Sequence, residues 1–149
     1  MTRRRMTFRG YALAIAVGII TSVLLSLIMV PAFKLGLSPF PKPLALAFAQ
    51  RILGPVPLAV GLFFHVVYVT FWSVVYLVVF ERLTFLNALW LAFLLWVLVL
   101  VVFFPIVGWG FLGLAVSPEL IAASLVPHLL FALFLWPLGR WAFRPRRAS

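Results

Sequence analysis

Long apolar runs, interrupted by charged residues only near their ends, are the dominant pattern of the sequence. The runs cover residues 11–30, 56–80, 84–104 and 118–141. An apolar helix of about 20 residues is long enough to cross the ~30 Å hydrocarbon core of a bilayer. We therefore predict an all-α integral membrane protein with four transmembrane helices in a single transmembrane domain, residues 1–149.

The connections between the runs predict how the spans are paired. Only a few residues around Glu81 and Arg82 separate the second run from the third, so these two spans are antiparallel neighbours. Before the fourth run, Ser117, Pro118 and Glu119 have the order of a helix cap, a first-turn proline and a favourable carboxylate. We expect two hairpins, spans one and two followed by spans three and four.

The longest connection, between the first two spans, contains a further predicted helix. Residues 43–53 are apolar and helix-prone, with the polar pair Gln50 and Arg51 near one end. A short helix of this kind is typical of a segment that lies in the membrane interface. We predict an interfacial helix in an outer loop that covers the bundle, and an external docking surface is the alternative.

The composition excludes a water-soluble fold. Of the 149 residues, 66% are hydrophobic and 9% are charged, whereas about 25% are charged in ordinary soluble domains. The formal net charge is +10, from twelve Lys and Arg against two Asp and Glu. The lipid bilayer is therefore the predicted surroundings of most of the surface.

The distribution of the basic residues predicts the orientation. With both termini cytoplasmic, nine basic residues lie inside and three outside, as the positive-inside rule favours. The inner set is Arg3, Arg4, Arg5, Arg9, Arg82, Arg140, Arg144, Arg146 and Arg147, and the outer set is Lys34, Lys42 and Arg51. We expect a multi-pass protein of the plasma membrane or inner membrane of a prokaryote.

Several chemical classes are excluded by the same residues. The chain has no cysteine, and its basic residues form no continuous face for nucleic acid. Residues 108–113 match GxGxxG, but no strand precedes them and no acidic residue follows at the required distance, so we expect no soluble nucleotide. We predict an apolar turn there instead, with Trp109 at the level of the lipid headgroups. Glu81 and Glu119 are predicted on opposite sides of the membrane, and no enzyme is expected.

A weak repeat relates the two halves of the sequence. In residues 30–39 and 104–118, a proline closes a span, glycine follows, and Ser-Pro precedes the next span. Each of these next spans contains one histidine, His65 or His128, roughly 14 to 16 Å from its outer end at 1.5 Å per residue. True duplication and chance similarity between apolar sequences both remain open.

Two imidazoles at one depth are the candidate chemistry of the spans. His65 and His128 suit the axial ligation of a haem b, with Tyr68 and Trp72 packing against it. The alternatives are a proton or ligand pathway, or helix packing and subunit contact, in which Ser124 hydrogen-bonds His128. No other metal site is expected. The aromatic face of the second span consists of His65, Tyr68, Trp72 and Tyr76.

Small residues follow one face of the first span. Ala14, Gly18, Ser22 and Ser26 recur every four residues and predict a groove for a closely packed helix. The partner is span two or four of the same chain, or a neighbouring subunit.

These features predict a small accessory subunit of a larger integral membrane complex, of respiratory, photosynthetic or monooxygenase type. Other membrane subunits are then its partners, and helix packing and lipid contact its main contribution. The alternative is a bis-histidine haem b electron-transfer protein. A small-solute transporter or pore is the third reading, because the spans have no carboxylate near their middle.

Overall fold

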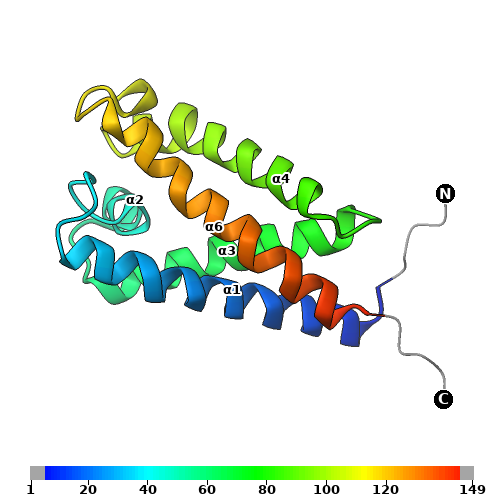
Figure 1. Ribbon diagram of the computed structural model, residues 1–149. Helices are drawn as coiled ribbons and strands as arrows, with labels where there is room; N and C mark the ends of the chain where they lie inside the picture. Colours follow the sequence, from blue (N-terminus) through cyan, green and yellow to red (C-terminus); the bar gives the residue numbers. More distant parts are fainter. Residues whose placement is uncertain (1–5, 145–149) are drawn as a thin grey trace, which may run out of the picture.

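The computed structural model describes residues 6–144, and this part of the chain consists of helices and short connections (Figure 1). Four helical segments are long and apolar enough to cross a membrane, α1 (Phe8–Lys34), α3 (Leu58–Val79), Phe85–Ile106 and α6 (Glu119–Ala142). The predicted all-helical class and the four apolar spans are confirmed. Five residues used for the orientation, Arg3, Arg4, Arg5, Arg146 and Arg147, lie outside the described residues.

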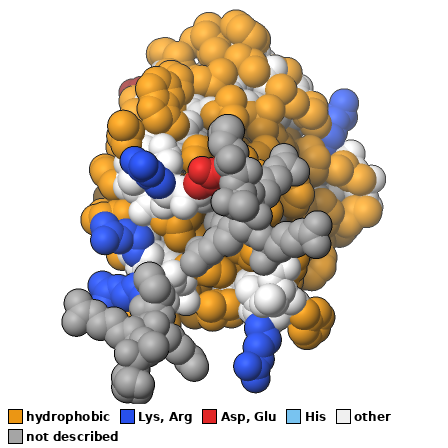
Figure 2. Space-filling view, turned by 90° about the vertical axis from the view of Figure 1, so that its right-hand side faces the viewer, with side chains coloured by type: hydrophobic (Ala, Val, Ile, Leu, Met, Phe, Trp, Pro, Cys, Tyr) orange, Lys and Arg blue, Asp and Glu red, His pale blue; other side chains and the backbone are white. Residues whose placement is uncertain are grey.

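The long helices form one bundle. α1 packs along both α3 and α6, α4 (Phe85–Leu98) packs along α6, and the short α2 (Leu44–Leu53) lies on α3. The described chain ends and the α3–α4 connection lie at one end of this bundle (Figure 1). Basic side chains lie around that end (Figure 2), and those of the described residues are arginines, Arg9, Arg82, Arg140 and Arg144. We call it the basic end. The opposite end is the α2 end.

Side-chain caps fix three helix starts. Thr7 Oγ1 accepts from Gly10 N–H at 3.3 Å, and Thr84 Oγ1 accepts from Asn87 N–H at 3.2 Å. Before α6, Ser117 Oγ accepts from Glu119 N–H at 3.2 Å. These bonds satisfy donors that a helix start leaves without an intrahelical partner.

The third span changes its winding near its end. α4 (Phe85–Leu98) continues into a π-helical turn, η1 (Val99–Phe103), and the short α5 (Phe104–Ile106). Pro105 has no backbone N–H, and its ring crowds the carbonyl four residues earlier in a regular helix. The wider turn accommodates this ring, with Phe104 N–H donating to the carbonyl of Val99. The helix thus passes through Pro105, where the sequence predicted an interruption.

The turn after the third span is held by aromatic packing. Trp109 is only 6% exposed, with its ring 5.8 Å from that of Phe40 and 5.4 Å from that of Phe104. Trp109 thus packs inside the protein, and its level relative to the lipid headgroups stays a prediction. The turn directly after Trp109 needs glycine at position 110. Gly110 has a φ of +77°, and an added Cβ would lie 2.8 Å from the Ala115 Cβ. It leads into the single turn η2 (Phe111–Gly113).

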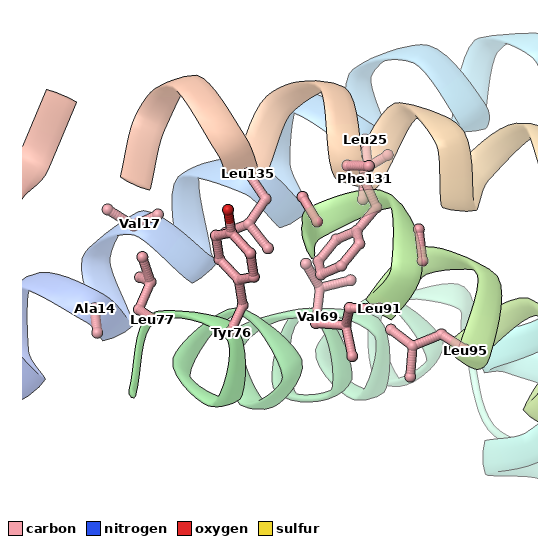
Figure 3. Close-up of a cluster of buried hydrophobic side chains, with 13 residues drawn as sticks. Ala14, Val17, Leu25, Val69, Tyr76, Leu77, Leu91, Leu95, Phe131 and Leu135 are labelled. Carbon is pink, nitrogen blue, oxygen red and sulfur yellow. The ribbon is translucent and has the colours of Figure 1, made fainter. Parts of the chain in front are cut away.

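The larger buried cluster lies among α1, α3, α4 and α6. Tyr76 and Leu135 point toward each other between α3 and α6 (Figure 3). The Tyr76 hydroxyl donates to the carbonyl of Thr84 at 2.9 Å. A Cβ added to Gly139 would lie 2.8 Å from Leu77 Cδ2, so the Leu77 side chain of α3 packs directly on the α6 backbone here. The buried cluster includes Ala14, Val17, Leu25, Val69, Tyr76, Leu77, Leu91, Leu95, Phe131 and Leu135.

Candidate functional site

A cavity of about 850 Å³ lies toward the α2 end, among α1, α2, α3 and α6. α3 and α6 contact each other at Leu77 and Gly139, near the basic end. At the α2 end, the cavity lies between the N-terminal parts of these two helices. Its volume falls in the range of about 300 to 1,000 Å³ that is usual for small-molecule sites. His65, His128, Tyr68, Trp72 and Ser26 all line it.

His65 lies two turns into α3. Its Nε2 is buried and has no hydrogen-bond partner among the described residues. The backbone of Ser22 on α1 lies beside the imidazole. In the tautomer that carries its proton on Nδ1, a neutral imidazole has its lone pair on Nε2.

His128 lies on α6 and is hydrogen-bonded within its own helix. Its Nδ1 lies 2.6 Å from the carbonyl oxygen of Ser124, and a carbonyl only accepts, so Nδ1 carries the proton. The lone pair is then again on Nε2. The sequence pointed to Ser124 as the partner of His128, and the structure specifies its backbone oxygen. The Ser124 hydroxyl instead accepts from Trp96 Nε1 at 3.0 Å.

Two aromatic side chains of α3 form part of the cavity wall. The ring of Tyr68 lies 6.3 Å from that of Trp72 and 5.6 Å from that of Phe103, both in edge-on arrangements. The Tyr68 hydroxyl is buried and has no hydrogen-bond partner among the described residues. Tyr76, predicted on the same face, is fully buried in the core. The aromatic face of α3 is thus shared between the cavity and the core.

The small-residue face of α1 packs on α3 and reaches the cavity. Ala14, Gly18 and Ser22 are buried, and a Cβ added to Gly18 would lie 2.7 Å from the Thr70 Cα. The Ser22 hydroxyl donates to the carbonyl of Ile19 within its own helix at 2.8 Å. Ser26, one turn further, lines the cavity. Close backbone approach along this face brings the Ser22 backbone beside His65.

Lysines lie where the cavity reaches the α2 end. Lys34, at the end of α1, and Lys42, before α2, are both exposed and line the cavity. Lys42 Nζ donates to Gln50 Oε1 at 2.9 Å, and Gln50 Nε2 donates to the carbonyl of Val56 at 3.1 Å. These bonds tie the segments on both sides of α2 together. A Cβ added to Gly61 would lie 2.7 Å from the Leu46 Cα, so α2 rests directly on α3.

Sequence reasoning did not identify the contribution of Trp96 to this region. Its Nε1–H donates to the Ile121 carbonyl and to the Ser124 hydroxyl, both at 3.0 Å. The sequence feature that could have predicted it is a tryptophan near the middle of a span, because a buried indole N–H needs a hydrogen-bond acceptor. The two lysines were assigned to topology alone, because their position beside the cavity depends on how residues 35–43 fold back.

No family model, curated protein or solved structure matches this chain. The described residues contain no group of three or more His, Cys, Asp and Glu side chains placed to hold a metal ion. The arrangement therefore offers two imidazole lone pairs, one unpaired tyrosine hydroxyl and an apolar wall, with positive charge at the α2 end.

Proposed function

We propose that this protein is a membrane-embedded subunit that holds one apolar small molecule in the cavity between α3 and α6. The observation that carries this proposal is the cavity itself, about 850 Å³ in volume and lined by both histidines. An apolar pocket with a few convergent polar groups is the usual form of a small-molecule site.

The proposed setting is a bilayer, crossed by two helical hairpins with both termini in the cytoplasm. This is supported by the four apolar helices and by the excess of arginine predicted for the inner side. The plasma membrane or inner membrane of a prokaryote is the proposed location. The cavity then opens in the outer half of the membrane, and α2 covers it from the outer side.

We further propose that the protein works inside a larger integral membrane complex. A cavity with two imidazoles but no nearby carboxylate among the described residues is suited to holding a molecule on which another subunit acts. Accessory packing and lipid contact remain part of this function.

The test is purification of the protein from its native membrane in a mild detergent. We expect other membrane subunits to copurify, together with about one extractable small molecule per chain, identified by mass spectrometry. Ser26→Leu fills the cavity and should remove the small molecule, whereas Leu27→Phe, on the exposed side of α1, should retain it. A monomer without a bound molecule, or equal retention by both variants, would contradict the proposal.

A further inference from the structure

Resting on the proposed function, we infer that the cavity binds haem b, with His65 and His128 as axial ligands and Lys34 and Lys42 as partners of its two carboxylates. The inference follows from four features of the site, the lone pairs, the shape of the space, the wall and the charged opening.

The first feature is the protonation pattern of the imidazoles. A histidine that binds a metal through Nε2 usually donates Nδ1–H to a carbonyl or carboxylate, which fixes the tautomer and the ring. His128 is held in this way by the Ser124 carbonyl at 2.6 Å. The Nε2 atom of His65 is buried and has no hydrogen-bond partner among the described residues. The His128 ring is therefore oriented for ligation through Nε2, and the Nε2 of His65 is free for the same role.

The number of ligands selects the class of metal site. Two histidines alone do not bind a free metal ion tightly, because Zn²⁺ sites need three or four protein ligands. The described residues provide no third His, Cys, Asp or Glu for such a site. A porphyrin supplies four nitrogens of its own, and two axial imidazoles complete six-coordination of its iron.

The second feature is the space between the ligands. α3 and α6 contact each other at Leu77 and Gly139, and the cavity separates them toward the α2 end. A flat molecule placed between two diverging helices presents one face to each of them. His65 on α3 and His128 on α6 line this cavity, so each is positioned to approach a different face.

The third feature is the apolar and aromatic wall. Tyr68, Trp72 and Phe103 form consecutive edge-on ring contacts along it, and all three line the cavity. A porphyrin is a large apolar disc, and burial against aromatic side chains stabilises it. A lipid chain would use the same wall but would leave both imidazole lone pairs without a partner, which is costly in a low-dielectric interior.

The fourth feature is the pair of lysines. His65 lies seven residues from the start of α3, which is about 10 Å at 1.5 Å per residue. The α2 end of the cavity is thus within reach of the edge of a porphyrin held at this depth. Haem b has two carboxylates on one edge, and Lys34 and Lys42 line the cavity there. A neutral quinone carries no negative group that could pair with these two lysines.

The experiment adds haemin to the full chain, purified in mild detergent, and records absorption and electron paramagnetic resonance spectra. We expect one haem per chain in a six-coordinate, low-spin state. His65→Ala and His128→Ala should each abolish that state. His65→Met and His128→Met keep a ligand at each position, and should retain haem with a shifted low-spin spectrum. Circular dichroism identifies any variant that loses its helices.

The lysines supply the second measurement. Lys34→Gln and Lys42→Gln should each weaken haemin binding several-fold without changing the low-spin spectrum. Arg51→Gln is the matched control, since Arg51 is basic and near the same end but does not line the cavity. Equal effects of all three substitutions would overturn the assignment of the carboxylates.

The outcomes separate the haem inference from the proposed function. If haemin gives no low-spin spectrum, or if both alanine variants keep it, the haem inference is wrong. Should a colourless quinone or lipid then be recovered at one per chain and be lost in Ser26→Leu, the ligand-binding function stands without haem. If neither haem nor another molecule is recovered, both proposals fail.

Discussion

The α3–α6 pair is packed at one end and hollow at the other. Near the basic end, Gly139 lets α6 approach Leu77, and the Tyr76 hydroxyl is paired with the Thr84 carbonyl. Toward the α2 end, Tyr68 occupies the same face of α3, but its hydroxyl has no hydrogen-bond partner among the described residues. The same residue type is thus structural in one half and available to a ligand in the other.

The largest effect is expected from enlarging Gly18 in the packed region. A valine there would place its Cβ 2.7 Å from the Thr70 Cα, and backbone atoms cannot move aside as a flexible side chain can. We expect Gly18→Val to lower the free energy of unfolding in detergent by about 3 kcal/mol or more. Gly10→Ala, whose added Cβ meets only the Met6 side chain at 3.4 Å or more, should not destabilise. Equal stability of both variants would show that α1 does not pack on α3 through this face.

Gly61→Val is the corresponding change beneath the cover of the hollow half. Its Cβ would meet the backbone of Leu46, so α2 must lift from α3. We expect a cost of about 1 to 3 kcal/mol in stability and a clear loss of the bound small molecule. Ala59→Val, at an exposed position of the same helix, is the control. Retention of the molecule by Gly61→Val would mean that α2 does not enclose the site.

The polar link between α4 and α6 should have a smaller effect. Trp96→Phe removes both hydrogen bonds of the indole, to the Ile121 carbonyl and the Ser124 hydroxyl. A loss of about 1 to 2 kcal/mol is expected, measured by chemical unfolding in detergent. Trp90→Phe changes a ring that is 62% exposed and should leave stability nearly unchanged. The opposite ranking would contradict the role of this link.

The smallest effect tests the comparison most directly. Tyr76→Phe removes the bond to the Thr84 carbonyl and should cost about 1 kcal/mol. Tyr68→Phe removes a hydroxyl without a partner, so the free energy of unfolding should not fall, while affinity for the bound molecule should change. If the two variants were equally destabilised, the two halves would not differ as described.

The four spans were predictable because each depends only on the length and apolar character of one run. The equal depth of His65 and His128 in the membrane stays a prediction from counting residues in the two spans. Their place in one cavity was not predictable, because it depends on the divergence of α3 and α6 and on α2. The same limit applies to Trp109, because its packing against Phe40 joins distant segments of the chain.

The π-helical turn of the third span has a consequence for the phase of that helix. In this turn the Phe104 N–H donates to the carbonyl of Val99, five residues earlier, instead of four as in a regular α-helix. The turn therefore acts like a one-residue insertion, which offsets the helix by about 100°. The first part of this span can then pack against α6, while Phe104 in its last part packs against Phe40 and Trp109. Deleting Val102 would restore a single phase and turn Phe104 away from those contacts.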